Sequence, residues 1–151
     1  MESTGKRFPI RRRDLTTRKL FVEFYLPESQ ALTTTLRNGA YEVKPLREIA
    51  KRMFDGPFGS DRTIDMYQDS GFPYIRVKDV LPGMIARDGL TYISPEKHKL
   101  LSRCRVIPGN VLLTIAGRVG TAAVFPADLV EGNITGHIVG IEPNDDSNPH
   151  Y

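Results

Sequence analysis

Two stretches in the first third of the chain carry apolar residues at the spacing of a helix. Pro27 suits the first position of a helix and Gly39 suits the position after its end, with apolar residues between them. Pro45 opens a second predicted helix, because four apolar residues after it repeat on one helical face. These four are Leu46, Ile49, Ala50 and Met53. The pattern therefore predicts two helices ahead of residue 55.

Beyond residue 70 the apolar runs are shorter and richer in β-branched and aromatic residues, which favours strands. The first predicted strand is Phe72 to Val80, which places Tyr74, Arg76 and Lys78 on one side. This strand is therefore expected to present a cationic face. Further strands are predicted at Leu90 to Ile93, Val111 to Ala116, Val119 to Phe125 and Ile134 to Ile141.

Proline and glycine mark the turns between these runs. Pro82-Gly83 and Pro108-Gly109 predict tight turns, and Gly117-Arg118 separates two apolar runs as the tip of a β-hairpin does. Ser94 is a suitable N-cap, followed by a proline, for a short helix over residues 97–102. Together these elements predict an α+β fold, with a β-rich mixed sheet and short flanking helices.

Length and composition suit a single globular domain. The chain has 151 residues, of which 40% are hydrophobic and 26% charged. No run reaches the ~18 apolar residues of a membrane span, and the start lacks the apolar stretch of a signal peptide, so we expect a cytoplasmic protein. Cys104 is the single cysteine, and the three histidines are scattered, so we expect no disulfide and no bound metal.

Positive charge is concentrated in particular parts of the sequence. The net charge is only +3, but residues 1–20 hold seven Lys or Arg against two acidic residues. Residues 44–118 hold thirteen Lys or Arg against eight acidic residues, whereas residues 119–151 hold five acidic residues and no Lys or Arg. A basic patch attracts phosphate groups, although a solvated surface explains such a bias equally well.

Five short phrases follow one another in the basic part of the chain. They are Gly-Pro-Phe-Gly-Ser at Gly56 to Ser60, Tyr-Ile-Arg at Tyr74 to Arg76, Tyr-Ile-Ser at Tyr92 to Ser94, Pro-Gly-Asn-Val-Leu at Pro108 to Leu112 and a Thr-x-x-Gly-x-x-Gly hairpin at Thr114 to Gly120. In this order they resemble the target recognition domain of the specificity subunit of Type I restriction-modification systems. The family commonly has Asp where this chain has Asn110, and both side chains suit a turn.

The resemblance implies sequence-specific recognition of double-stranded DNA without catalysis. In that family the specificity subunit positions methyltransferase (modification) and endonuclease (restriction) subunits, which supply the chemistry, so no cofactor is expected on this chain. We expect residues 1–40 to form a basic N-terminal arm and lead-in helix. Residues 41–151 are then expected to form the N-terminal part of a recognition domain that is truncated, because the later part and the connecting helices of the family are missing.

The expected DNA contacts are cations and hydroxyls on or beside the glycine-bearing loops. Arginine binds a guanine edge or a phosphate, and hydroxyls donate to phosphate oxygens. We expect Arg118, at a hairpin tip, to read bases and Arg76, on a strand face, to contact phosphate. The full set of expected DNA-binding residues is Ser60, Arg62, Arg76, Lys78, Arg87, Thr114 and Arg118. His98 is expected to be exposed on a helix and His137 to be packed in a strand.

Two other functions fit parts of the sequence. One is the recognition domain of a fused methyltransferase-endonuclease, and the other is a β-barrel module that binds RNA. Asn148-Pro149-His150-Tyr151 resembles the Asn-Pro-Pro-Tyr motif of amino-methyltransferases, but its third residue differs and no glycine-rich cofactor motif precedes it. We therefore predict a non-catalytic chain.

Overall fold

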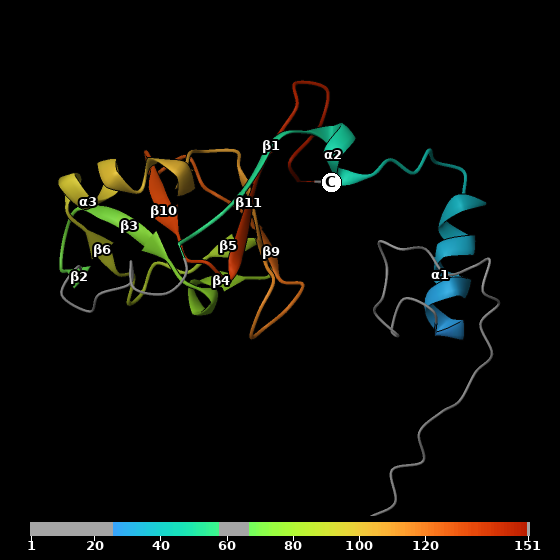
Figure 1. Cartoon of the computed structure of the whole chain (residues 1–151), viewed down its shortest axis with the longest axis horizontal. Helices are drawn as coiled ribbons and strands as arrows, with labels where there is room; N and C mark the ends of the chain where they lie inside the picture. Colours follow the sequence, from blue (N-terminus) through green and yellow to red (C-terminus); the bar gives the residue numbers. More distant parts are fainter. Residues whose placement is uncertain (1–25, 58–66, 151) are drawn as a thin grey trace, which may run out of the picture. The chain divides into compact units, whose positions relative to one another are not determined.

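The computed structural model describes residues 26–57 and 67–150, which belong to two compact units, Met1–Lys44 and Pro45–Tyr151. In the first unit, helix α1 spans Pro27–Arg37 (Figure 1) and confirms the predicted helix. Pro27 starts it, and at its end the N–H of Asn38 donates to the carbonyl of Thr34 and the N–H of Gly39 donates to the carbonyl of Leu36. None of the α1 side chains is buried.

The second unit contains short strands joined by turns and short helices. In chain order its elements are α2 (Leu46–Ile49), β1 (Ala50–Asp55), β2 (Tyr67–Gln68), β3 (Phe72–Ile75), the 3₁₀ turn η5 (Val77–Asp79), β4 (Val80–Leu81), β5 (Met84–Ile85), β6 (Tyr92–Ile93), α3 (Pro95–Leu100), the 3₁₀ turn η6 (Ser102–Cys104), β7 (Arg105–Val106), β8 (Val111–Thr114), β9 (Ala122–Val124), β10 (Gly132–Ile134) and β11 (Ile138–Pro143). Among the described residues, no helix has the length and apolar character needed to cross a bilayer.

These strands form three sheets. The first has the order β1-β11-β8-β9 and is antiparallel throughout. The second has the order β2-β6-β3-β10-β7 and is mixed, because β3 and β10 run parallel. The hairpin β4-β5 forms the third and lies against β9, where the N–H of Gly83 donates to the carbonyl of Ala122 (2.9 Å). The architecture confirms the predicted α+β class with a mixed sheet and short helices.

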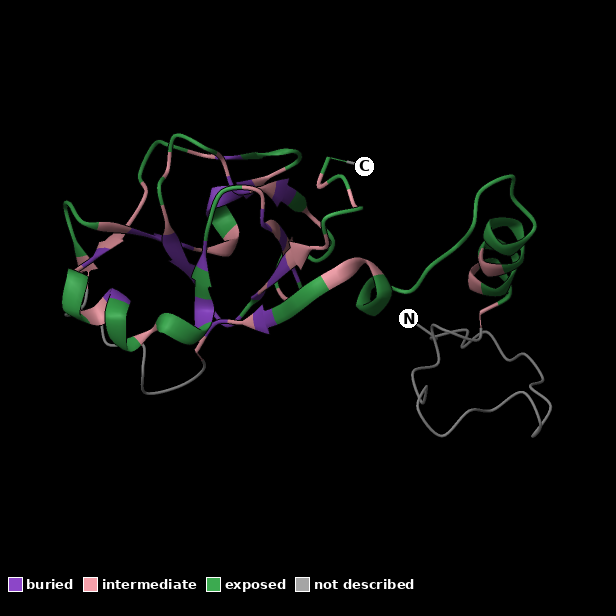
Figure 2. Cartoon of the chain, turned by 90° about the horizontal axis from the view of Figure 1, so that it is seen from above, coloured by how far each residue is buried: buried purple, intermediate pink, exposed green. Residues whose placement is uncertain are grey.

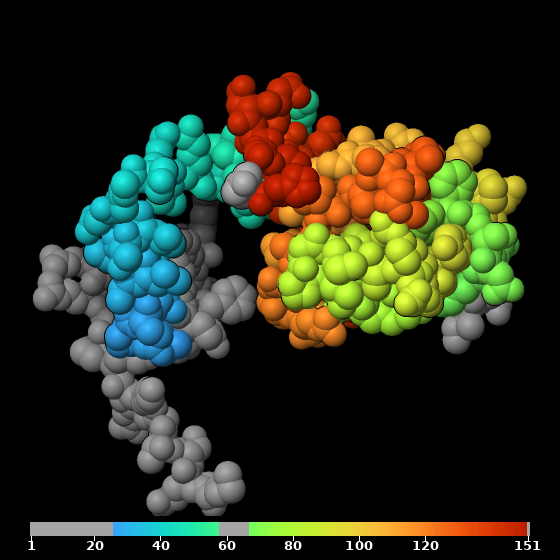
Figure 3. All heavy atoms as spheres, turned by 180° about the vertical axis from the view of Figure 1, so that it is seen from behind, coloured from blue at the N-terminus to red at the C-terminus, as the bar shows by residue number. Residues whose placement is uncertain are grey.

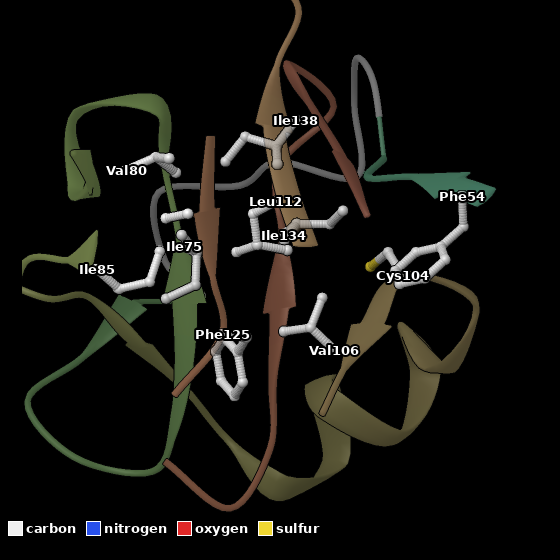
Figure 4. Close-up of a cluster of buried hydrophobic side chains, with 11 residues drawn as sticks. Phe54, Ile75, Val80, Ile85, Cys104, Val106, Leu112, Phe125, Ile134 and Ile138 are labelled. Atoms are coloured by element: carbon white, nitrogen blue, oxygen red, sulfur yellow. The ribbon is translucent and has the colours of Figure 1, made fainter. Parts of the chain in front are cut away.

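One main hydrophobic core connects the sheets. Its fully buried side chains include Ile75 of β3, Leu112 of β8, Ile134 of β10 and Ile138 of β11, together with Phe125 just after β9. Figure 4 shows these side chains gathered between the strands, and Figure 2 shows that the buried residues lie mostly on strands. The core therefore fixes the strands from which the loops project.

The first and last strands of this unit are neighbours. β1 pairs with β11, from Asp55 opposite Val139 to Arg52 opposite Glu142. Beyond this pair, the N–H of Asn144 donates to the carbonyl of Ile49 (3.0 Å). Figure 3 shows the C-terminal residues lying against the segment that begins this unit.

The predicted helix from Pro45 is wrong over most of its length. Only Leu46–Ile49 is helical, and Ala50–Asp55 is strand β1. The apolar spacing fits a helix, but pairing with β11 satisfies the backbone groups of this segment and buries Phe54, which is not on the predicted helical face. Tertiary pairing thus overrides a short local pattern.

Two predicted strands are each divided by a turn. Phe72 to Val80 separates into β3, the turn η5 and β4, because the carboxylate of Asp79 accepts a hydrogen bond from the N–H of Arg76 and folds the chain there. The predicted cationic strand face is therefore wrong. Ile134 to Ile141 separates at Thr135–His137, so that β10 and β11 belong to different sheets.

Other predicted elements are confirmed. Pro82-Gly83 and Pro108-Gly109 are turns, and both glycines have positive φ (77° and 88°). Ser94 caps α3, where its hydroxyl accepts from the N–H of Lys97. Strands β8 and β9 form the predicted hairpin, and β6 occupies the end of the predicted strand at Leu90 to Ile93.

The environments predicted for two histidines are wrong. His98 is buried, because its ring stacks on Phe72 (3.8 Å between ring centroids) and its Nδ1 lies 2.5 Å from Asn133 Oδ1. Its Nε2 also lies 3.3 Å from Glu131. His137 is exposed, because it lies in the turn that separates β10 from β11 rather than inside a strand.

Candidate nucleic-acid interface

The loop of the β8–β9 hairpin is fixed by Thr114. Its side chain is only 1% exposed, and its hydroxyl donates to the carbonyl of Arg118 and accepts from the N–H of Thr121 (3.0 Å). Gly117 and Gly120 have φ of 71° and 86°, a region that favours glycine. The hydroxyl predicted to contact DNA therefore holds the hairpin loop in shape and is directed away from solvent.

Arg118 lies at the tip of this loop and is exposed. Its side chain makes no hydrogen bond or ion pair with any other residue of 26–57 or 67–150, and its guanidinium carries five donors. An exposed guanidinium at the tip of a hairpin is suited to a phosphate or to the O6 and N7 acceptors of guanine.

The second cationic element is the turn at Arg76–Asp79. Asp79 is 1% exposed, and its Oδ2 accepts from the N–H (2.9 Å) and from Nε (3.4 Å) of Arg76. Nζ of Lys78 lies 3.4 Å from Asp79 Oδ1. Both cations also donate to the carbonyl of Gly89, Arg76 at 3.0 Å and Lys78 at 3.1 Å. The turn therefore places two cations side by side over one buried carboxylate.

Both cations retain unused donors for a ligand. The side chain of Lys78 is 56% exposed, and an ammonium has three donors, of which Asp79 and Gly89 occupy two. The side chain of Arg76 is 28% exposed, and its contacts use fewer than its five donors. The net charge of the turn is +1, because Asp79 offsets one of the two cations.

The hairpin loop and the cationic turn are adjacent. A Cβ at Gly117 would lie 3.7 Å from Cγ1 of Val77, so the loop lies directly over the turn. Figure 1 shows both on the same side of the strands, as the loop that joins β8 to β9 and the turn next to β4. Arg118, Arg76 and Lys78, three of the predicted residues, are therefore brought to one end of the sheets, which we call the tip end.

Two further loops complete the tip end. The N–H of Ile115 donates to the carbonyl of His137 (2.9 Å), which joins the hairpin to the turn between β10 and β11. Gly56 packs against that same turn, since a Cβ there would lie 2.2 Å from the carbonyl oxygen of Ile134. The start of the Gly-Pro-Phe-Gly-Ser phrase thus reaches the tip end.

The guanidinium of Arg87 has a different acidic partner. Its guanidinium forms a two-pronged ion pair with Asp128, Nη2 at 2.7 Å from Oδ1 and Nε at 3.2 Å from Oδ2. Arg87, Pro108 and Gly109 line one open cavity of about 500 Å³ at the opposite end of the β8–β9 hairpin, which we call the turn end. The backbone next to Arg87 adjoins the cationic turn, where the N–H of Ala86 donates to the carbonyl of Asp79 (2.8 Å), but the Arg87 guanidinium is bound by Asp128 and not by the Asp79 carboxylate.

Ser60 and Arg62 lie outside the described residues. Sequence reasoning also missed parts of the tip end, namely Asp79 and the carbonyl of Gly89. The Arg-x-x-Asp spacing at residues 76–79 carries a weak signal for Asp79, because a carboxylate at that position can cap the start of a turn. Nothing local marks Gly89, which is 13 residues from Arg76. Within residues 26–57 and 67–150 there is no cluster of metal-ligating side chains.

Comparison with known proteins finds similarity in structure only. No protein-family model matches the sequence, and no curated protein matches it. Solved structures do match, among them the HsdS subunit from Thermoanaerobacter tengcongensis and a chain from a study of complex assembly and conformational transition of the type I R-M system. Each has 18% sequence identity and a TM-score of 0.51, and the match covers 85% of this chain.

The chain has the fold of part of an HsdS subunit. It spans about a third of those neighbours, since the match covers 34% of their length. The described strands form three separate sheets, which does not favour the β-barrel RNA-binding alternative.

Proposed function

We propose that this chain recognises double-stranded DNA by sequence, as part of the specificity subunit of a type I restriction-modification system. The observation that carries the proposal is the tip end, where an HsdS-like fold brings Arg118, Arg76 and Lys78 together. A cluster of cations on loops attracts the DNA backbone, and a projecting hairpin can enter a groove.

In this proposal the chain is not an enzyme and works in the cytoplasm, where its DNA target is. It would position methyltransferase and endonuclease subunits over a target sequence, and these subunits would supply the chemistry. The tip end offers cations, glycines and backbone groups, which suit binding rather than bond cleavage.

Binding of DNA by the 151-residue chain tests the proposal. Fluorescence anisotropy with random duplexes should give a non-specific Kd on the order of 10⁻⁴ to 10⁻⁶ M near physiological salt, and the affinity should fall steeply as salt rises. Selection from a random duplex library should then enrich a defined sequence. Equal or tighter binding of structured RNA, or binding that ignores salt, would contradict the proposal.

Calorimetry with S-adenosylmethionine tests the non-catalytic part separately. We expect no heat of binding, because the proposal places the cofactor on the methyltransferase partner. A stoichiometric heat would move the chain into the alternative class of fused methyltransferases, whether or not it binds DNA.

A further inference from the structure

Asp79 is a buried acidic residue at the centre of the cationic tip end. A carboxylate repels DNA phosphates, so its presence beside the proposed DNA surface needs a physical reason. Its side chain is 1% exposed, and it contacts two cations and one backbone N–H, all from the same four-residue turn. Such a carboxylate is a structural support for the charges around it.

The contacts of Asp79 fix both direction and spacing of the cations. The bond to the N–H of Arg76 shapes the backbone, and the contact to Nε orients the guanidinium. Lys78 is held by the other carboxylate oxygen, and both cations meet again at the carbonyl of Gly89. Without the carboxylate, two like charges two residues apart would share one carbonyl and would tend to separate.

The turn also supports the hairpin loop. Val77, which lies between the two cations, is the residue that Gly117 faces, and Arg118 follows Gly117 directly. The backbone geometry that Asp79 imposes on residues 76–79 is therefore part of the platform beneath Arg118. One buried carboxylate is linked to three of the expected DNA-contacting residues.

We propose that Asp79 is a positioning residue for sequence recognition, which holds Arg76 and Lys78 beside the hairpin tip at the expense of one unfavourable charge. This role rests on the proposed DNA-binding function, and it separates general affinity for DNA from discrimination between sequences. Removal of the negative charge should strengthen the general attraction for DNA, whereas loss of positioning should weaken discrimination between sequences. The two effects have opposite signs.

The test uses Asp79→Asn in the 151-residue chain, with the sequence selected by the unmodified chain and a random duplex as probes. We expect affinity for the random duplex to stay equal or rise, with a salt slope steeper by up to about 1. The ratio of selected to random affinity should fall about fivefold or more, which is the discrimination that one well-placed base contact supplies. An unchanged ratio would overturn the role of Asp79.

Asp128→Asn is the matched control. It removes the same charge from the exposed ion pair with Arg87, and it leaves in place the carboxylate that contacts Arg76 and Lys78. We expect its affinity for both duplexes to rise slightly together, with an unchanged ratio. If Asp128→Asn lowers the selected-to-random affinity ratio as much as Asp79→Asn does, the loss is an effect of charge, and the positioning role of Asp79 is contradicted.

Lys78→Met keeps the proposal testable if Asp79→Asn does not fold, because Lys78 is largely exposed. A positioned lysine should lower the selected-to-random ratio when removed, and an equal loss on all duplexes would contradict the proposal. Failure of the unmodified chain to bind DNA would instead contradict the proposed function itself, and with it this role. Binding by that chain with no effect of either variant on the ratio contradicts only the role of Asp79.

Discussion

Arg118 and Arg87 look alike in the sequence but have different environments. Each lies within two residues of a glycine in a loop. The side chain of Arg118 has no hydrogen-bonding partner in the described part of the chain, whereas both prongs of the Arg87 guanidinium are bound by Asp128, 41 residues away. The availability of a cation for DNA is therefore decided by a distant carboxylate, and not by the loop in which the cation lies.

The same contrast holds for the two ends of the β8–β9 hairpin. At the tip end, Asp79 is shared between two cations and Arg118 adds a further positive charge. At the turn end, the charges of Arg87 and Asp128 are matched. The tip end therefore has an excess of positive charge that can attract an anion, whereas the Arg87–Asp128 pair at the turn end has no net charge.

The largest expected effect is a difference in stability between glycine substitutions at the two ends, Gly56 at the tip end and Gly109 at the turn end. In Gly56→Ala the new Cβ would lie 2.2 Å from both Ile134 O and Thr135 C, which are backbone atoms and cannot yield easily. We expect a loss of about 3 kcal/mol or more in the free energy of unfolding. Gly109→Ala meets nothing within 4 Å, so only its positive φ of 88° opposes alanine, at about 1 kcal/mol. Urea unfolding of both variants measures the difference in unfolding free energy. Equal losses in the two variants would contradict the close packing of Gly56 against the backbone of residues 134 and 135.

A second prediction compares the two arginines directly. Arg118→Ala should cost ~1 to 3 kcal/mol of binding free energy on the selected duplex if Arg118 reads a guanine. Arg87→Ala should leave the sequence preference unchanged, because its guanidinium is engaged by Asp128. Anisotropy titrations with selected and random duplexes distinguish the cases. A larger effect of Arg87 than of Arg118 would reverse the comparison and place the DNA at the turn end.

The assignment of Thr114 gives a smaller effect. Thr114→Val keeps the shape of the side chain but removes the buried hydroxyl that bonds the backbone of Arg118 and Thr121, so the hairpin loop loses these hydrogen bonds. We expect a loss of about 1 to 2 kcal/mol in unfolding free energy. Arg87→Met, which removes an exposed ion pair, should cost no more than about 1 kcal/mol. If Thr114→Val is fully stable and yet loses DNA affinity, the hydroxyl contacts DNA as the sequence predicts.

The smallest effect concerns Cys104, which lies in the core shared by both ends. Burial raises the pKa of the Cys104 thiol above its ordinary value of 9.0, so the folded protein holds the proton more tightly than the unfolded chain does. The unfolded state then loses the proton first, and stability should decline as pH rises above about 9. In Cys104→Ala this part of the decline should disappear. Unfolding curves between pH 7 and 10.5 test this, and the same decline in both proteins would assign it to other groups.

The elements that sequence predicts well are those marked by local chemistry. Pro27 starts α1, Ser94 caps α3, and the glycines around Arg118 mark a hairpin, because each acts within a few residues. The failures arise where distant residues decide. β1 is a strand because β11, more than 80 residues later, pairs with it, and His98 is buried because Phe72 and Asn133 receive its ring.

The candidate site follows the same division. Arg118 is recognisable from the sequence as a cation at a hairpin tip, whereas Arg76 and Lys78 are predicted on a strand face and lie at a turn. The fold brings all three to the tip end. The pairing of Arg87 with Asp128 cannot be read from the sequence, because no local pattern connects residues 87 and 128. The burial of Thr114 likewise depends on the closed hairpin and not on its neighbours in the chain.

The pairing of β1 with β11 makes the second unit easy to transplant. Because β1 lies beside β11, the chain segments that precede residue 50 and follow residue 143 are neighbours. A module of this kind can be inserted into a loop of another protein without forcing the host backbone apart, and its ends can be joined for circular permutation. One such unit can thus replace another in a larger polypeptide while the host framework stays intact.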